Sequence, residues 1–221
     1  MENDIILVRP TLELKEKALD YRKEHFQHGE EIIYGSELFD KTESYEEWLS
    51  SVTLNTNPQT VNENWVVTDT FFAIRKSDDK IIGIIDLRHT LNEFLKDLGN
   101  CGYSVRPSER KKGYATEMLY QLLQVAKEAE MKELYISVEK ENVASLKVIQ
   151  KNGGVYERSF SFENGVADIY KIAVCGWHSA GAASGLAVRQ GYPERRAEPA
   201  VAGDVPGAGY RAAARPDCRQ Q

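Results

Sequence analysis

The stretch from Tyr103 to Glu130 constrains the fold of this chain more than any other part of the sequence. Residues 100–105 are typical of a strand that Arg106-Pro107 ends, and a helix is predicted over 113–130 after a basic loop. The helix is amphipathic, because apolar residues recur at steps of three and four: Tyr114, Met118, Leu119, Leu122, Val125, Ala126 and Ala129. A strand that enters a helix through so short a loop predicts an α/β fold.

The loop before this helix is suited to hold a phosphate group. Free backbone N–H groups and the positive end of the helix dipole make a helix N-terminus an anion site. Gly113 lacks a Cβ, so a phosphate can approach the backbone closely, and Ala115 is nearly as small. Arg110, Lys111 and Lys112 add positive charge. The arrangement predicts a pyrophosphate site, although these residues alone fit a solvated basic turn equally well.

The rest of residues 1–174 alternates strand and helix patterns, which again predicts α/β. Helices are expected after Thr11 and after Ser44, where Glu47 completes a capping box. The remaining elements are strands at 5–8, 70–75, 80–87, 133–138, 155–162 and 166–174, a hairpin turn at 77–79, a short helical insert at 91–95, and a helix over 142–152 that Gly153-Gly154 ends.

The composition changes at residue 175. From Cys175 to Gln221 there is no Lys, Ile or Phe, and four of the seven prolines lie there. No apolar period runs through the segment, so it cannot bury enough surface to offset the entropy of ordering it. We expect residues 175–221 to be a disordered, non-native tail on a domain formed by residues 1–174.

Charge and composition exclude several classes of protein. The net charge of −6 argues against a nucleic-acid binder, and no run approaches the about 20 apolar residues that span a bilayer. The acidic start of the chain lacks the features of a signal peptide. Three scattered cysteines predict no disulfide framework and no metal site. We therefore expect a cytoplasmic protein that binds no metal, nucleic acid or membrane.

Residues 110–115, Arg-Lys-Lys-Gly-Tyr-Ala, match the R/Q-x-x-G-x-G/A signature of the GNAT acetyltransferases, and the chain resembles that superfamily from residue 4 to about 174. The order of the elements agrees, and Asn142-Val143-Ala144-Ser145 with Lys151-Asn152-Gly153 is similar to the family's N-x-x-(A/S)…K-x-G segment. The run at 102–119 is most similar to a bacterial group of predicted acetyltransferases. The resemblance implies a mixed central sheet of six to seven strands flanked by about four helices.

The resemblance also implies the reaction, in which the acetyl group of acetyl-CoA moves directly to a primary amine, either a small cationic amine or an amino group. The pantetheine arm would lie between the 100–105 and 133–138 strands, with a strand amide to stabilise the oxyanion. Cofactor contacts are expected from Ser104, Val105, Arg110, Lys111, Lys112, Gly113, Tyr114, Ala115, Asn142 and Ser145. An acceptor site is implied at residues 28–48, and a homodimer is expected.

The attacking amine must lose a proton, and several side chains could take it. Glu93 lies in the insert near the acceptor entrance, and Glu139 follows the fifth strand. Asp86 and His89 are further candidates. Each of these residues also fits an ordinary surface or loop position.

The leaving thiolate could need a proton donor. Many family members place a Tyr on the helix after the fifth strand, but this chain has Ile149 there. Tyr103 and Tyr135 are possible substitutes, and each also fits a packing role. Cys101 could support a covalent route, but no matching His/Asp pair accompanies it, so we expect a small buried cysteine.

Two other kinds of protein fit the same residues. A CoA-binding sensor or regulatory module that turns over weakly would explain Ile149 and the lack of an obvious base. An unrelated nucleotide-binding domain is disfavoured, because neither G-x-x-x-x-G-K-S/T nor G-x-G-x-x-G occurs.

Overall fold

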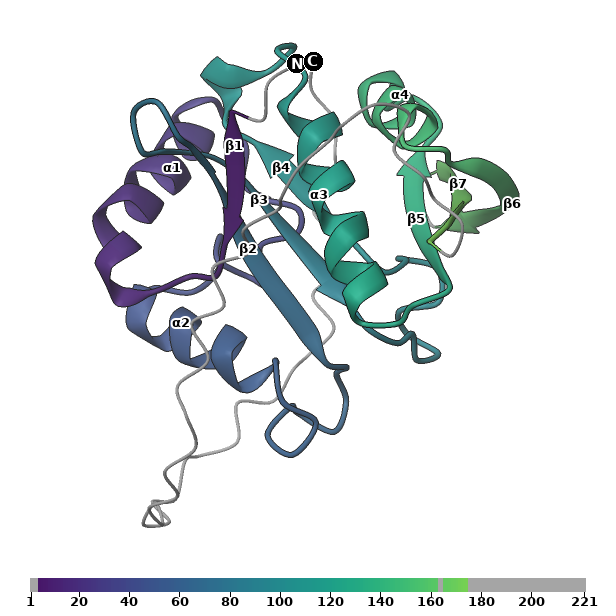
Figure 1. Ribbon diagram of the computed structural model, residues 1–221, viewed down its shortest axis with the longest axis horizontal. Helices are drawn as coiled ribbons and strands as arrows, with labels where there is room; N and C mark the ends of the chain where they lie inside the picture. The colour runs from purple at the N-terminus through teal and green to yellow at the C-terminus, as the bar shows by residue number, and fades with distance from the viewer. Residues whose placement is uncertain (1–3, 163–164, 175–221) are drawn as a thin grey trace. The chain divides into compact units, whose positions relative to one another are not determined.

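Seven strands, four α-helices and two short 3-10 helices make up the described part of the chain, residues 4–162 and 165–174 of the computed structural model (Figure 1). Four strands form one antiparallel sheet in the order β1-β2-β3-β4: β1 (Ile5–Val8), β2 (Thr68–Arg75), β3 (Lys80–Arg88) and β4 (Tyr103–Val105). Three form a second antiparallel sheet in the order β5-β7-β6: β5 (Glu133–Glu139), β6 (Val155–Phe162) and β7 (Gly165–Ala173).

The division into two sheets differs from the single mixed sheet that we expected. The α/β class and the seven strands are as predicted. Among the described residues, however, the two sheets are joined by one isolated bridge between Gly99, four residues before β4, and Ile136 of β5. The chains separate beyond that point because β4 pairs with β3 while β5 pairs with β7.

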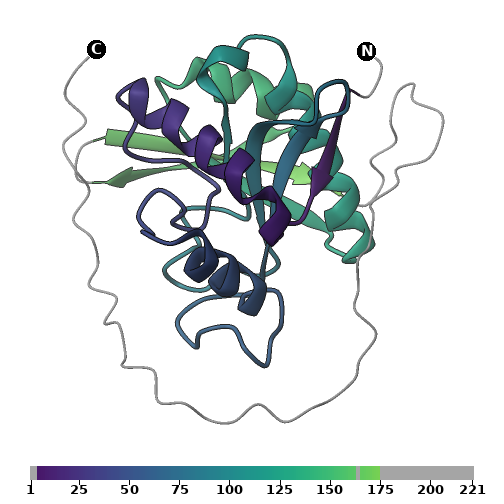
Figure 2. The same cartoon turned by 90° about the vertical axis from the view of Figure 1, so that its left-hand side faces the viewer.

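Helices cover both faces of the four-stranded sheet. One face carries α1 (Lys15–Gln27) and α2 (Tyr45–Leu54), which Figure 2 shows in front of the strands. The other face carries α3 (Tyr114–Glu128), which contacts β1, β3 and β4, and α4 (Val143–Lys151) packs against α3 and β5. The 3-10 helices are η1 (Leu12–Leu14) and η2 (Pro107–Glu109).

Burial on both faces explains the nearly continuous apolar runs of β2 and β3. On the α3 face, Phe71, Ile82 and Ile85 pack with the apolar stripe of α3. On the other face, Phe72 and Ile84 meet an aromatic cluster from α1, α2 and the loop between them, which contains Tyr21, Phe39, Tyr45 and Trp48. The loop between α1 and α2 is thereby fixed against the sheet.

Local signals account for most element ends. Ser44 caps α2, because its Oγ accepts the N–H of Glu47 at 3.3 Å, as the capping box predicts. The expected cap at Thr11 is wrong, since a 3-10 turn follows it without a side-chain cap and α1 begins at Lys15. The expected helical insert at 91–95 is a set of turns instead, in which Asn92 accepts the N–H of Leu95.

None of the helices in the described ranges is both long and apolar enough to cross a membrane. The predicted tail at 175–221 lies outside the described residues.

Candidate functional site

A wedge opens between β4 and β5. The segment just before β4 is joined to β5, where the N–H of Asn100 bonds the carbonyl of Tyr135 at 2.6 Å and the Asn100 side chain accepts the Tyr135 N–H at 2.8 Å. From there β4 runs to Val105 along β3, and β5 runs along β7. The apex of the wedge is therefore at residues 99–100, and its mouth is at the loop that follows β4.

The backbone of β4 turns alternate residues toward the wedge. The N–H of Asp86 on β3 bonds the carbonyl of Gly102 at 3.2 Å. In an antiparallel ladder both backbone groups of one residue point to the same side, and neighbours alternate. Ser104 therefore faces β3, while Tyr103 and Val105 face the wedge. Of the two residues expected to pair with a cofactor arm, Val105 is on the wedge side, where its carbonyl accepts Arg110 Nε at 3.1 Å, and Ser104 is not.

The loop at the mouth has the backbone geometry of an anion site. Gly113 is the N-cap of α3 with φ +89°, and no side chain caps the helix. Lys111 is also left-handed, with φ +64°. The Tyr114 and Ala115 amides follow directly in the first turn of α3. Gly113 fits the predicted role, because a residue with a Cβ would be strained in this conformation.

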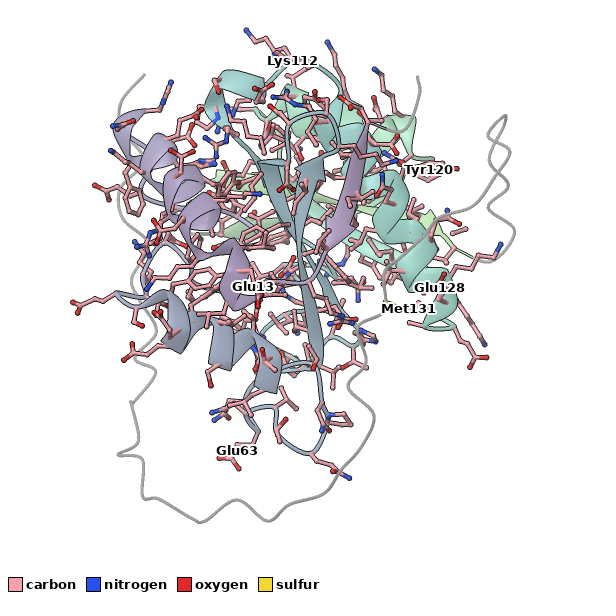
Figure 3. The ribbon with its side chains drawn as sticks, turned by 60° about the vertical axis from the view of Figure 1, so that its left-hand side comes forward. Glu13, Glu63, Lys112, Tyr120, Glu128 and Met131 are labelled. Atoms are coloured by element: carbon pink, nitrogen blue, oxygen red, sulfur yellow. The ribbon has the colours of Figure 1, made fainter. Side chains whose placement is uncertain are left out.

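The basic side chains of the loop are mostly paired with carboxylates. Arg110 forms a two-pronged ion pair with Glu30, at 2.5 and 2.7 Å. Lys112, which extends to the solvent at the edge of the molecule in Figure 3, bonds Glu109 at 2.8 Å. Within the described part of the chain Lys111 forms no ion pair and is exposed. Lys111 and the backbone amides are thus the groups available to an anion without breaking an existing pair.

A buried arginine anchors the start of this loop to α1. Arg106 Nη1 bonds Glu24 at 2.7 Å and Asp20 at 3.0 Å. The N–H of Ser108 donates to the other Glu24 oxygen at 2.8 Å. Burial opposes the charge on Glu24, but the bonds from Ser108 and Arg106 outweigh it and lower the pKa of Glu24 to about 2.

Tyr103 and Ser145 meet across the α4 side of the wedge. The Tyr103 hydroxyl lies 2.6 Å from Ser145 Oγ. Asn142 caps α4 by accepting the N–H of Ser145 at 3.0 Å, as its position predicts. Burial raises the pKa of Tyr103, although the hydrogen bond to Ser145 opposes this. The structure thus brings Tyr103, Asn142 and Ser145 together, although Tyr103 and Ser145 are 42 positions apart in the sequence.

Ile149 and Cys101 are core residues. Ile149 is fully buried in the apolar cluster around α3, so the position that holds Tyr in many relatives does not face the wedge here. Cys101 is buried as expected, and burial raises the pKa of its thiol. Neither side chain is placed to exchange a proton with a substrate.

The other candidate bases lie apart from one another. Glu93 is 92% exposed and pairs with Lys96 at 2.7 Å. Glu139 is the exposed last residue of β5. His89 Nε2 lies 2.9 Å from Asp69, whose other oxygen binds Arg9 at 2.6 Å. Their catalytic role stays a prediction.

The most unusual cluster beside the wedge was only partly predicted. It contains Glu37, Asp86 and Arg88, which we call the Glu37 cluster. Asp86 and Arg88 lie two residues apart on β3, and Arg88 Nη2 is 2.6 Å from Asp86 Oδ2 and 3.9 Å from Glu37 Oε1. The side chains of Glu37 and Asp86 are 6% and 0% exposed. Burial and the negative charge of Asp86 raise the pKa of Glu37 to about 8, although Arg88 opposes the shift.

Sequence reasoning named Asp86 among several candidates but missed Glu37 and Arg88. Glu37 belongs to the acidic and aromatic segment at 28–48, where the family resemblance implies the acceptor site. Its position in that segment is the sequence feature that could have pointed to Glu37. Elsewhere in the described ranges, no group of three or more His, Cys, Asp or Glu side chains is arranged to hold a metal ion.

Comparison with known proteins identifies the fold and the family. The family model for the acetyltransferase (GNAT) domain matches residues 6–155. No curated protein matches the sequence. Among solved structures, RimL, a ribosomal-protein alpha-N-acetyltransferase in complex with coenzyme A, has a TM-score of 0.56 at 13% identity, covering 77% of this chain and 94% of RimL.

Two other solved structures are similar to the same degree. The spermidine/spermine N-acetyltransferase SpeG from Vibrio cholerae has a TM-score of 0.55 at 14% identity, covering 79% of this chain and 96% of SpeG. The microcin self-immunity acetyltransferase MccE, in complex with acetyl-CoA and AMP, has a TM-score of 0.55 at 18% identity, covering 77% of this chain and 92% of MccE. The chain belongs to the GNAT acetyltransferase family.

Proposed function

We propose that this protein is an N-acetyltransferase that transfers the acetyl group of acetyl-CoA directly to a primary amine. The observation that carries the proposal is the wedge between β4 and β5, whose mouth is the uncapped, left-handed Gly113 start of α3. An extended arm can lie along the open edge of β4 as an added strand, while the amides at the mouth hold its pyrophosphate.

The residues of the mouth fit a CoA pyrophosphate. Gly113 permits close approach of the backbone, and the amides of Lys112 to Ala115 surround the start of the helix. Lys111 adds one exposed positive charge. The Arg110 guanidinium could bind the pyrophosphate only after leaving Glu30, because both of its terminal nitrogens bond that carboxylate. We therefore assign binding chiefly to backbone amides.

The Tyr103–Ser145 pair is our candidate for the proton donor to the CoA thiolate. The Tyr103 hydroxyl holds its proton at neutral pH and lies 2.6 Å from Ser145 Oγ, so it can donate that proton as the C–S bond breaks. Ser145 would pass or orient that proton. This pair takes the place of the donor that Ile149 cannot supply.

Isothermal titration of the full chain with acetyl-CoA tests the cofactor. We expect binding by the wild type and a loss of about 100-fold in affinity in Gly113→Glu, which adds bulk and negative charge at the amides. Gly113→Ala is the matched variant, because it carries the same backbone strain without the charge. Equal binding by the wild type and Gly113→Glu would refute this assignment.

Thiol release separates turnover from a sensor. Steady release of CoA from acetyl-CoA in the presence of one amine establishes the transferase. A protein that binds acetyl-CoA tightly but releases no thiol with any primary amine would be the regulatory module that the buried Ile149 leaves open.

A further inference from the structure

We propose that the Glu37 cluster (Glu37, Asp86 and Arg88) is the subsite for the ammonium group of the acceptor, and that the Glu37 carboxylate is the base that removes its proton. The inference rests on the proposed acetyl transfer and names its substrate class, a small primary amine with an aromatic or apolar body. Asp86 and Arg88 act as positioning residues.

The cluster lies at the closed end of the wedge. Asp86 Oδ1 accepts the N–H of Gly102 at 2.5 Å, and Gly102 directly precedes β4. The phosphate-binding loop is at the opposite end of β4, so an arm that enters there points its thiol end toward the apex. From Val105 to Gly102 is about 10 Å of strand. The acetyl group would therefore arrive beside the residue that Asp86 holds.

Two buried polar atoms in this region, Thr70 Oγ1 and Arg88 Nε, lack a hydrogen-bond partner among the described residues, while Asp86 Oδ2 is held in the ion pair with Arg88 Nη2 at 2.6 Å. Thr70 is directly opposite Asp86 in the ladder between β2 and β3, so both side chains point to the same face. Leaving such atoms unsatisfied is costly. An ammonium group can donate three hydrogen bonds. Thr70 Oγ1 has a vacant acceptor position, and each carboxylate of Glu37 and Asp86 has lone pairs that can accept in addition to its present bonds.

Aromatic side chains mark the approach to the cluster. The indole N–H of Trp65 donates to Glu37 Oε2 at 2.9 Å, and the Arg88 guanidinium lies 5.9 Å from the Trp65 ring. Trp65 in turn lies 6.4 Å from the ring of Phe94, which is 66% exposed. Exposed aromatic rings attract cations and apolar groups. An amine with an aromatic body fits this rim, with its ammonium directed inward.

The proton balance of the step is simple. The Glu37 carboxylate takes one proton from R–NH3⁺, the amine nitrogen forms the C–N bond, and the C–S bond breaks with its electron pair on sulfur. The nitrogen loses its second proton and the thiolate gains one, so one proton is released per turnover. Because the pKa of Glu37 is about 8, the active carboxylate form increases as the pH rises through that value.

Two charged neighbours set this titration. Asp86 raises the pKa of Glu37 and Arg88 lowers it. Asn55 and Trp65 donate to Glu37 but carry no charge. Removing the Asp86 charge should therefore lower the pKa of Glu37, so that its active carboxylate forms at lower pH.

The test measures thiol release from acetyl-CoA with phenethylamine as the acceptor, from about pH 6 to pH 9.5. The proteins are the wild type, Glu37→Gln, Asp86→Asn and the control Glu63→Gln, whose exposed side chain lies at the lower edge of the molecule in Figure 3. We expect Glu37→Gln to lower kcat/KM by about 100-fold or more without changing the affinity for acetyl-CoA. Asp86→Asn should shift the rising limb of the pH profile to lower pH, and Glu63→Gln should match the wild type.

The outcomes separate the two proposals. A wild type that does not bind acetyl-CoA would overturn the proposed function and this inference together. A wild type that binds acetyl-CoA but does not acetylate phenethylamine would overturn the inference alone. The inference would also be overturned if Glu37→Gln had the kcat/KM of the wild type. It would likewise be overturned if the rising limb of the pH profile were at the same pH in Asp86→Asn as in the wild type. Thermal unfolding of each variant shows that a loss of rate is not a loss of fold.

Discussion

Glu37→Gln should make the protein more stable, and increasingly so as the pH rises. Glu37 has an ordinary pKa near 4.5 in the unfolded chain and about 8 in the folded protein, because burial and Asp86 disfavour its charge. A carboxyl group with a raised folded pKa contributes stability below its unfolded pKa and loses it as the pH rises through the folded value. Glutamine carries no charge, and its carbonyl can still accept from Trp65 and Asn55.

The size of the effect follows from the shift. From 4.5 to about 8 the folded and unfolded chains differ by one bound proton, and each pH unit costs about 1.4 kcal/mol. At pH values above 8, ionisation of Glu37 would therefore destabilise the wild type by at most about 5 kcal/mol. Water entry and movement of the loop that carries Glu37 reduce it, so we expect the wild type to lose about 2 kcal/mol relative to Glu37→Gln between pH 5 and pH 8.

Urea unfolding followed by tryptophan fluorescence measures this difference. The free energy of unfolding is determined for both proteins at several pH values between about 5 and 9. Because Glu24, Glu30 and His25 are unchanged in both proteins, the difference between the two curves isolates Glu37 together with its interaction with Asp86. The Glu63→Gln variant controls for loss of a surface charge.

Two results would contradict this reasoning. Parallel pH profiles for the wild type and Glu37→Gln would mean that Glu37 titrates normally in the folded protein. A variant that is less stable than the wild type at pH 8 would mean that the charged carboxylate is stabilised by Arg88 more than it is destabilised by burial.

Four further predictions follow from packing and hydrogen bonding. Tyr103→Phe should lower kcat by about 10-fold or more while costing only about 1 kcal/mol in chemical denaturation, because the ring stays packed and only the hydroxyl is lost. Gly35→Ala should cost at least about 2 kcal/mol, since Gly35 has φ +72° and an added Cβ would be 2.1 Å from the carbonyl oxygen of Gly102; a normal melting temperature would refute this. Ile149→Ala should destabilise by about 2 to 4 kcal/mol, and a loss of activity at unchanged stability would instead indicate that the side chain faces substrate. Deletion of residues 176–221 should leave the melting temperature and acetyl-CoA affinity unchanged, and a large loss of either would contradict the expected non-native tail.

Signals confined to one segment were predicted well. The helix over 113–130 appears as α3 at Tyr114–Glu128, because its apolar stripe and the glycine before it are properties of neighbouring residues. The caps at Ser44 and Asn142 were correct for the same reason, since each side chain bonds an amide three residues on. The turns at 91–98 were missed because the apolar spacing there fits a helix that is too short to form without packing.

The residues of the candidate site differ in the same way: those within one segment could be predicted, and those that depend on contacts between distant segments could not. The loop predicted to bind a phosphate is a contiguous run, so its residues could be named from the sequence, and the structure adds that the backbone at Gly113 is left-handed. Which residue of β4 faces the wedge depends on hydrogen bonding to β3, so Ser104 and Val105 could not be distinguished in advance. The engagement of Arg110 by Glu30 likewise joins residues 80 positions apart.

The sequence by itself determined the α/β pattern, the amphipathic helix, the glycine at its start and the family to which the chain belongs, because these depend on periodicity and on local backbone chemistry. Only the tertiary structure decided that Ile149 is buried, that β4 and β5 separate into a wedge, and that Glu37 meets Asp86 and Arg88. Such contacts are made between elements distant in the chain, and the shifted pKa of Glu37 exists only because folding removes water from that meeting point.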